Sequence, residues 1–325
     1  MSYTSPATLV QAARLINDDE GAIYIAGGTD LMVRRSLGID KTTHLIDLSA
    51  ISALRGITLN SETLSIGATT TLAELASSSA VRSHFPALAE AALSIASPPI
   101  RNSATVAGNL LCENRCIYYD QSEAWQAAAG GCLKCGSEIC IATGSTKSCY
   151  SVFISDLAPV LIVLSAQVEV LEHDDFAEDE ASPTSVLSPR ITSKPVEWLY
   201  TGDGLDPHTI SKRDIVTRIL IRTLDPTEHP IFFKKLRPRA SVDFTNLTVA
   251  MCRMRDGTFT LAASGIGPGP AVLRNAESDD AEVLAASLLK QTMIIDNVSY
   301  RRAYRKDMLR ETIAEGLHFL AQKPL

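Results

Sequence analysis

The cysteines of this chain are concentrated in one short segment, and that concentration restricts its fold more than any other feature. Six of the seven cysteines lie between Cys112 and Cys149, and the seventh is Cys252. Cysteines grouped in this way usually form disulfides or bind a metal. The odd total argues against disulfides, as does the start MSYTSPATLVQAARLINDDE, which lacks the basic and apolar stretches of an export signal. We therefore expect reduced thiols that bind iron or zinc.

The spacing of these cysteines leaves the metal open. Cys112 and Cys116 form a C-x3-C pair, and Cys132 and Cys135 form a C-x2-C pair. Two short pairs are typical of a structural zinc site. An iron–sulfur cluster needs four converging thiolates, usually from loops, and six cysteines can provide these as well. From the residues alone, zinc and iron–sulfur are about equally favoured, ahead of cysteines that are merely buried apolar residues.

The charge and hydropathy of the chain exclude other classes of protein. Its 325 residues carry a formal net charge of −7 with a pI of about 5.4, which argues against a nucleic-acid-binding protein because such proteins need a basic surface. No apolar run approaches the roughly 20 residues that span a bilayer. The length allows two domains, each with a core of its own. We expect a cytoplasmic protein that neither binds nucleic acid nor spans a membrane.

Two glycine-containing turns follow apolar segments. In IAGGTD, residues 25–30, glycines let backbone N–H groups approach an anion, and Thr29 adds a hydroxyl. The helix that follows directs its positive end to the same place. The turn lacks the G-x-G-x-x-G spacing of a dinucleotide fold, so an ordinary tight turn is the commoner explanation. The similar turn TVAGN, residues 105–109, strengthens the functional interpretation, because two such turns could bracket a pyrophosphate.

The hydrophobic pattern predicts an α/β part followed by antiparallel strands and helices. The natural boundary lies near residues 200–215, and the acidic segment Asp174–Pro189 is expected to be an exposed loop. The turn 101–111 is expected to follow a strand. The remaining expected elements are a helix over 6–17; a strand, turn and helix over 22–38; a strand over 43–49; a hairpin over 56–68; helices over 70–78 and 85–97; a helix and strand over 155–173; a strand over 213–223; a hairpin over 243–267; and helices over 280–291 and 299–321.

Four segments taken together resemble the FAD-binding medium subunit of the xanthine oxidase family of molybdenum enzymes. These segments are, in order, IAGGTDLM, IGATTTLAEL, ASPPIRNSATVAGNLL and SDLAPVL. The resemblance covers nearly the whole chain and implies an α+β fold. Residues 1–212 would form a PCMH-type, vanillyl-alcohol-oxidase-like FAD-binding domain of two α/β lobes. Residues 213–325 would form a C-terminal domain of antiparallel strands packed with helices.

The cysteine segment is an insertion at about 112–150 that most family members lack. It resembles the β subunit of 4-hydroxybenzoyl-CoA reductase, which carries an extra [4Fe-4S] cluster there with the pattern C-x15-C-x7-C-x8-C. The segments RCIYYDQSEAW and CLKCGSEIC are similar to that subunit, and some bacterial aldehyde oxidoreductase FAD subunits hold a cluster here with a different cysteine spacing. The resemblance makes four cysteines the cluster ligands, in place of the zinc pairs, and leaves out the other cysteines of the segment. These ligands are Cys116, Cys132, Cys140 and Cys149.

The family resemblance also implies where FAD binds. The two glycine turns would hold its pyrophosphate and ribityl parts, Asp156 would contact the cofactor, Lys235 would lie near the flavin, and Ile215 or Val216 would pack on the ring. The sequence departs from the family at two places. Pro98-Pro99 stiffen the backbone where the chain approaches the cofactor. Alanine at position 107 is tolerated only if its φ is negative. The implied contacts are Ile25, Ala26, Gly27, Gly28, Thr29, Asp30, Leu31, Met32, Thr105, Val106, Ala107, Gly108, Asn109, Asp156, Val216 and Lys235.

The function implied by this resemblance is electron transfer rather than substrate chemistry, and no catalytic residue is expected in the chain. FAD and a [4Fe-4S] cluster would be its cofactors. Its partners would be a molybdopterin-binding large subunit, a [2Fe-2S] small subunit and an external carrier such as ferredoxin, in a dimer of heterotrimers. The alternatives are an FAD subunit of a molybdenum hydroxylase or aldehyde oxidoreductase, a stand-alone flavoenzyme with structural zinc, and a scaffold that has lost FAD.

Overall fold

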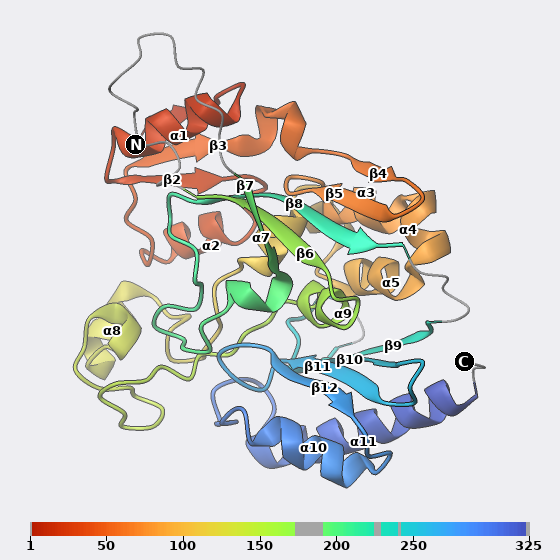
Figure 1. Cartoon of the computed structure of the whole chain (residues 1–325). Coiled ribbons are helices and arrows are strands. Elements are labelled where there is room, and N and C mark those ends of the chain that lie inside the picture. The colour runs from red at the N-terminus through yellow and green to blue at the C-terminus, as the bar shows by residue number, and fades with distance from the viewer. Residues whose placement is uncertain (1, 173–190, 224–228, 240–241, 323–325) are drawn as a thin grey trace.

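Three β-sheets with helices between and around them build the protein, as the computed structural model in Figure 1 shows. The structure describes residues 2–172, 191–223, 229–239 and 242–322. The acidic segment that was predicted to be a loop, Asp174–Pro189, lies outside the described residues.

The N-terminal sheet is parallel and places the first glycine turn at its carboxyl edge. Its strands β1 (Ser2–Thr4), β2 (Ala22–Ile25) and β3 (His44–Asp47) stand in the order β1-β3-β2. Helix α1 (Leu9–Asn17) joins β1 to β2, and its first turn is capped by the Thr8 hydroxyl. The turn after β2 leads into α2 (Leu31–Ser36). Loops at the carboxyl ends of parallel strands are common ligand sites.

The second sheet has five strands in the order β4-β5-β8-β6-β7, and all its pairs are antiparallel. The predicted hairpin is confirmed as β4 and β5, with the Asn60 side chain accepting hydrogen bonds from the N–H groups of Glu62 and Thr63. Strand β8 follows the predicted boundary at residue 212, yet it pairs with β5 and β6 of the N-terminal part. The strands are β4 (Ile57–Leu59), β5 (Thr63–Gly67), β6 (Gln167–Leu171), β7 (Ile191–Pro195) and β8 (Ile215–Arg222).

A group of short helices fills the space between the second sheet and the third. Helix α9 is central, because all seven of its residues are buried and it contacts β10 and β11 of the third sheet (Figure 1). The α-helices of this region are α3 (Leu72–Ser77), α4 (Ser79–His84), α5 (Pro86–Ser94), α6 (Pro98–Arg101), α7 (Val106–Leu110) and α9 (Leu157–Val163), and its 3-10 turn is η5 (Val196–Leu199). The 3-10 turns η1 (Leu48–Ala50) and η2 (Ser52–Leu54) instead follow β3 and pack into the core beside the N-terminal sheet.

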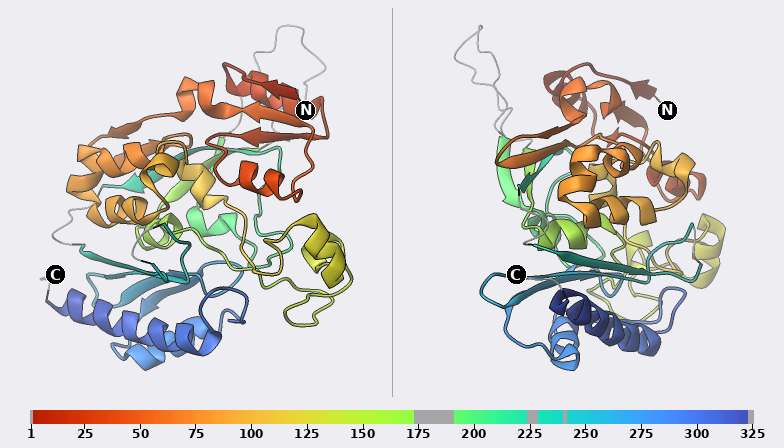
Figure 2. Two further views of the ribbon diagram at one scale, coloured as in Figure 1. Left: turned by 180° about the vertical axis from the view of Figure 1, so that it is seen from behind. Right: turned by 90° about the vertical axis from the view of Figure 1, so that its right-hand side faces the viewer.

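The C-terminal part is the predicted antiparallel sheet with two helices on one face. The hairpin turns at Gly257, whose φ of +87° favours glycine. Helices α10 and α11 pack together against the outer face of the sheet (Figure 2). The elements are β9 (Ile231–Leu236), β10 (Leu247–Arg253), β11 (Phe259–Ser264), β12 (Ala271–Ala276), α10 (Ala281–Leu289) and α11 (Arg302–Ala321), in the sheet order β12-β11-β10-β9. The α+β architecture is therefore confirmed.

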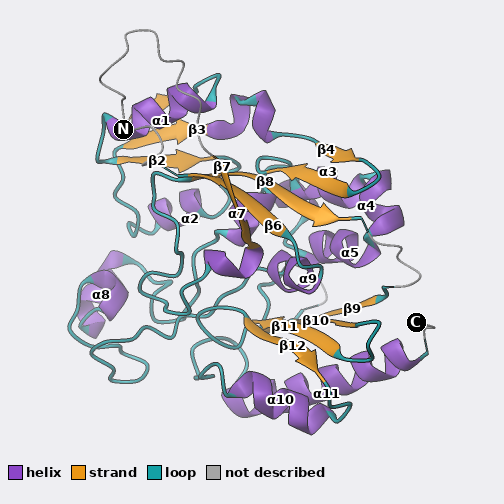
Figure 3. Ribbon diagram, in the orientation of Figure 1, coloured by secondary structure: helices purple, strands orange, loops and turns teal. Residues whose placement is uncertain are grey.

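The cysteine segment projects from one side of the molecule and is built mainly of loops (Figure 3). Its regular structure is α8 (Glu123–Ala129) and the 3-10 turn η3 (Leu133–Cys135). The segment just before the cysteine segment differs from the prediction. A strand followed by a turn was expected there, and residues 106–110 instead form the short helix α7. The hydroxyl of Thr105 caps this helix by accepting a hydrogen bond from Gly108 N–H. Among the helices described here, none is both long and apolar enough to cross a bilayer.

Candidate cofactor sites

A cavity of about 540 Å³ lies between the N-terminal sheet, the segment around α7 and strand β9. This volume falls within the range of small-molecule sites. Two of the predicted contacts do not line it: Met32 is 46% exposed, and Val106 is fully buried in the core. The cavity is lined by the other predicted contacts, namely Ile25, Ala26, Gly27, Gly28, Thr29, Asp30, Leu31, Thr105, Ala107, Gly108, Asn109, Asp156, Val216 and Lys235.

The first glycine turn offers unused backbone donors to this cavity. The N–H groups of residues 26–31 donate to no acceptor in the described parts of the chain. Gly28 has a φ of +67°, and a Cβ on Gly27 would come within 1.9 Å of the Ser103 carbonyl oxygen. Both positions therefore need glycine, one for its conformation and one for close packing. A turn with free N–H groups at the edge of a cavity suits a phosphate-bearing ligand.

The second turn contributes differently, because the fold already uses its backbone. The N–H groups of Val106 and Ala107 donate to carbonyl oxygens of residues 70 and 68, at 2.9 and 3.1 Å. The Asn109 side chain accepts a hydrogen bond from the Ser155 hydroxyl at 2.8 Å, which ties this turn to the start of α9. Ala107 lies within α7 and has a negative φ, so alanine is tolerated there. The N–H groups of residues 106–109 therefore all donate within the fold.

A buried ion pair closes the cavity on the side of the C-terminal part. The Lys235 ammonium lies 2.6 Å from Oδ2 of Asp156, and both side chains are 4% exposed. The Thr248 hydroxyl donates to Oδ1 of Asp156 at 2.6 Å, and Lys235 also donates to the Ser94 carbonyl oxygen at 3.1 Å. Burial raises the pKa of the Asp156 carboxyl, while the lysine and the threonine oppose that effect. The predicted contacts Asp156 and Lys235 thus face the same cavity as partners of each other.

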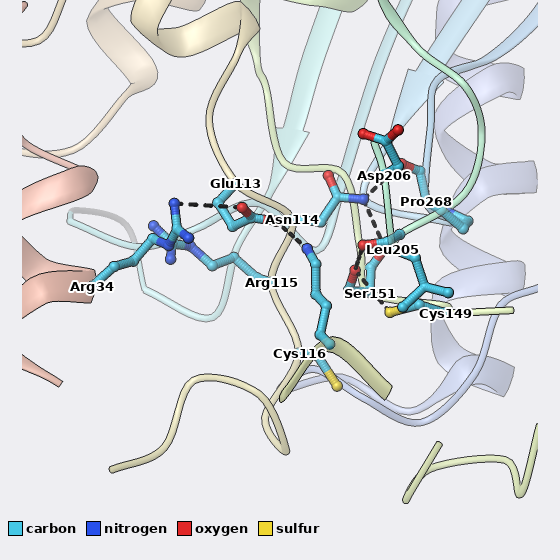
Figure 4. A network of polar contacts seen from close by, with 12 residues as sticks. Arg34, Glu113, Asn114, Arg115, Cys116, Cys149, Ser151, Leu205, Asp206 and Pro268 are labelled. Atoms are coloured by element: carbon cyan, nitrogen blue, oxygen red, sulfur yellow. Dashed lines mark hydrogen bonds and ion pairs between the residues drawn. The ribbon is translucent and has the colours of Figure 1, made fainter. Parts of the chain in front are cut away.

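A network of charged side chains joins the glycine turn to the cysteine segment. Arg115 forms an ion pair with Asp30 of the turn. Glu113 lies 3.4 Å from Arg34 of α2 and also pairs with Lys134, which stands between two cysteines of the segment. Figure 4 shows Arg34 and Glu113 facing each other across this junction. Arg34 and Arg115 also line the large cavity. We did not predict either arginine, because nothing in their local sequence separates them from ordinary surface arginines.

A second, smaller cavity lies inside the cysteine segment and is lined by the four predicted ligands. Cys116, Cys132, Cys140 and Cys149 all border it, whereas the other two cysteines of the segment do not. The ends of the segment are brought together by reciprocal backbone hydrogen bonds of 2.8 and 2.7 Å between Arg115 and Val152. The cavity measures about 20 Å³, little more than one water molecule requires.

The cysteines outside this cavity have distinct surroundings. Cys112 is buried and lines the large cavity instead, where burial raises the pKa of its thiol. Cys135 is exposed, and its sulfur lies 3.7 Å from that of Cys132. Within the described residues, no three His, Cys, Asp or Glu side chains form a group that could hold a single metal ion. Neither the two cysteine pairs nor the four predicted cluster ligands therefore form such a group in the described residues.

Comparison with known proteins places these features in context. Residues 1–181 match the family described as "FAD binding domain in molybdopterin dehydrogenase". The chain is 28% identical over 326 residues to the aldehyde oxidoreductase FAD-binding subunit PaoB of Escherichia coli strain K12, covering 97% of this chain and 98% of that protein. It is 43% identical over 110 residues to the xanthine dehydrogenase FAD-binding subunit of Escherichia coli O157:H7, covering 34% of this chain and 38% of that one.

The fold also has solved counterparts. A chain of carbon monoxide dehydrogenase from Hydrogenophaga pseudoflava, in a form that lacks the Mo-pyranopterin moiety of the molybdenum cofactor, superposes with a TM-score of 0.71. The match covers 100% of this chain and 98% of that chain at 20% sequence identity. At this level of identity the likeness concerns the fold alone, and it extends over both the N-terminal part and the C-terminal sheet.

Proposed function

The chain belongs to the family of FAD-binding domains in molybdopterin dehydrogenases, and from this premise we propose that it is the flavin and iron–sulfur subunit of a multi-subunit molybdenum oxidoreductase similar to 4-hydroxybenzoyl-CoA reductase. The predicted PCMH-type FAD-binding fold is confirmed by the family match and the structural likeness. The assignment as an FAD-dependent oxidoreductase subunit is confirmed as well. The [4Fe-4S] cluster, the external carrier and the reductase-like role are the parts that we propose.

The large cavity fits FAD on three counts. The turn after β2 offers N–H groups without other acceptors, which suits a pyrophosphate. The buried Asp156–Lys235 pair presents a carboxylate and an ammonium, which suit a cofactor with hydroxyl and carbonyl groups. Val216 and Ile215 add an apolar wall from β8. When bound, FAD exchanges electrons singly or in pairs, so it links two-electron and one-electron carriers.

One observation carries the proposal of a [4Fe-4S] cluster: the four cysteines that the family resemblance implies as ligands border one cavity, and the other two cysteines of the segment do not. A single zinc ion with Zn–S bonds of about 2.3 Å would need sulfurs about 3.8 Å apart, and the described residues contain no such group of three or more ligands. Four thiolates are the number of ligands that a [4Fe-4S] cluster takes. Since the cavity is only about 20 Å³, the loops must separate when a cluster is assembled.

Two consecutive residues of the chain line the two cavities. Arg115 lines the large cavity, and its neighbour Cys116 lines the cysteine cavity. The ion pairs of Arg115 with Asp30 and of Glu113 with Arg34 and Lys134 hold this junction in place. A cluster at Cys116 would therefore lie beside the cofactor that the glycine turn binds, which supports direct electron transfer between the two.

We place the FAD of this chain in an electron path with four other stations. These are an external carrier such as ferredoxin, the [4Fe-4S] cluster, the [2Fe-2S] cluster of a small subunit and the molybdenum site of a large subunit, assembled as a dimer of heterotrimers. The names of the relatives support this role, because they are FAD-binding subunits of aldehyde oxidoreductase and xanthine dehydrogenase. The seven cysteines are all free thiols in the structure, which accords with the proposed cytoplasmic location.

A second candidate is the FAD subunit of an aldehyde oxidoreductase, in which electrons would leave molybdenum through this chain. The observation that favours it is the 28% identity to PaoB over 97% of the chain, a span that includes the cysteine segment. Purifying the chain with its partners separates the two. Aldehyde oxidation by the complex would support this candidate, and reduction of an aromatic acyl thioester by a low-potential donor would support the reductase.

The cluster is tested by replacing cysteines inside and outside the small cavity. We expect the purified chain to show flavin bands with broad brown absorbance and about four irons. Cys140→Ala should lose most of this iron and keep FAD, because Cys140 borders the small cavity only. Cys135→Ala is the matched control and should keep its iron. Full iron content in Cys140→Ala, or zinc in place of iron in the unaltered chain, would contradict the proposed ligands.

A further inference from the structure

Arg115 belongs to the cysteine segment, yet its side chain borders the large cavity. Three side chains hold it there. Its guanidinium forms an ion pair with Asp30 of the glycine turn and lies 3.6 Å from Asp120. It also stands over the ring of Phe244, 4.9 Å from the ring centroid, and Phe244 comes from the C-terminal part of the chain. A long and flexible side chain is thus fixed in one place at the wall of the cavity.

These contacts leave hydrogen-bond donors of the guanidinium unused. An arginine carries five N–H donors, and the Nε–H of Arg115 has no acceptor within the described residues. Burial lowers the pKa of Arg115, and the nearby carboxylates of Asp30 and Asp120 more than offset this effect, so the guanidinium keeps its charge. The side chain is only 13% exposed, and a charge so far removed from water is stabilised by acceptors for its remaining donors. A ligand rich in anionic oxygens provides such acceptors.

The charges around the large cavity are balanced before any ligand binds. Among the described residues, four carboxylates and four cationic side chains line it. The Asp156–Lys235 pair lies on the side of the C-terminal part. Beside the glycine turn the cations are Arg34 and Arg115, which Figure 4 shows extending toward each other from opposite sides. Because like charges repel strongly in a buried site, a diphosphate next to the Asp30 carboxylate needs these cations.

We propose that Arg115 is a further cofactor-binding residue: it is the counter-ion of the FAD pyrophosphate, and the cysteine segment thereby completes the flavin site. This inference rests on the proposed binding of FAD in the large cavity, and it does not depend on what the cysteines hold. Hydrogen bonds from arginine to phosphate are charge-assisted and strong. Asp30 holds the guanidinium beside the turn whose N–H groups, those of residues 26–31, have no other acceptor. The pyrophosphate thus meets backbone donors from one segment and a fixed cation from another.

The test compares ligands with and without phosphates in titrations of the flavin-free full chain. Arg115→Gln removes the cation and should lower the FAD affinity about tenfold to a hundredfold, the loss expected for charge-assisted hydrogen bonds. Riboflavin has the same ring system without phosphates, so its affinity should not change. Lys134→Gln is the matched control, because it removes a cation that pairs with Glu113 in the same network and does not border the large cavity. Its FAD affinity should equal that of the unaltered chain.

A double variant keeps the test decisive if Arg115→Gln does not fold, since that change leaves the Asp30 carboxylate without its ion-pair partner. Asp30→Asn combined with Arg115→Gln removes both charges of the pair and leaves no carboxylate unpaired. Its FAD affinity should stay at least about tenfold below that of the unaltered chain, because the counter-ion is still missing. Full recovery of FAD affinity in the double variant would show that Arg115 serves Asp30 alone, and would refute the inference.

Hydrogen exchange adds a readout that a purely structural role of Arg115 would not move. Saturating FAD should slow exchange of residues 113–120 in the unaltered chain, because the cofactor and this segment stabilise each other. The slowing should be absent in Arg115→Gln at saturating FAD.

Separate outcomes refute the inference and the proposed function. An unaltered chain that binds no FAD would contradict the proposed function. If the unaltered chain binds FAD, an unchanged FAD affinity in Arg115→Gln would refute the role of Arg115 alone. An equal loss of riboflavin and FAD affinity, or an equal loss of FAD affinity in Lys134→Gln, would refute it as well, because the effect would then not come from a contact with the phosphates.

Discussion

Replacing Gly27 by alanine should weaken FAD binding through a backbone collision. The added Cβ would lie 1.9 Å from the Ser103 carbonyl oxygen and 2.6 Å from its carbonyl carbon, whereas ordinary contacts lie at 3.4–4 Å. The glycine turn and the segment that leads to α7 must then separate by about 1.5 Å, and overpacking of this kind costs about 1–3 kcal/mol. Because both segments line the large cavity, we expect FAD affinity to fall about 10- to 100-fold.

The assay is titration of the flavin-free chain with FAD, accompanied by denaturant unfolding. Gly130→Ala is the control. Its φ is +89° and no atom lies within 4 Å of the added Cβ, so it should cost about 1–2 kcal/mol through the left-handed conformation alone. Gly130 ends α8 and does not line the large cavity, so its FAD affinity should not change. Unaltered FAD affinity in Gly27→Ala, or an equal loss in Gly130→Ala, would refute the reasoning.

Two further predictions concern buried charged groups. Lys235→Met leaves the Asp156 carboxylate buried without its ion-pair partner. The free energy of unfolding in urea should fall by about 3–5 kcal/mol. Adding Asp156→Asn should recover much of this loss, and no recovery in the double variant would contradict the pairing. Burial lowers the pKa of His208, so below about pH 6.5 the unfolded chain binds the proton first. The free energy of unfolding should therefore fall as the pH drops from 6.5 toward the folded-state pKa, by at most about 1.4 kcal/mol for each pH unit. Urea unfolding at pH 7 and 5.5 measures this fall, and His208→Gln should make it smaller.

Much of the secondary structure could be predicted because its causes are local. The bend at Asn60 and the glycine at 257 use short-range turn chemistry, and both hairpins formed as expected. The segment 105–109 was wrongly expected to be a turn after a strand. Its helix has only five residues, and the Thr105 cap that starts it leaves little periodicity to detect. Cysteine spacing, together with the family resemblance, selected the four thiols that border the small cavity.

The sequence by itself determined the hairpins and the long helices, because periodicity and turn residues are properties of neighbouring positions. Only the tertiary structure decided that β8 pairs with β5 and β6 in the second sheet, that Arg115 lies between the two cavities, and that Asn297 meets the Cys116 segment. Such contacts join segments that are far apart along the chain. They depend on how whole sheets and helices pack, and no pattern of neighbouring residues records that packing.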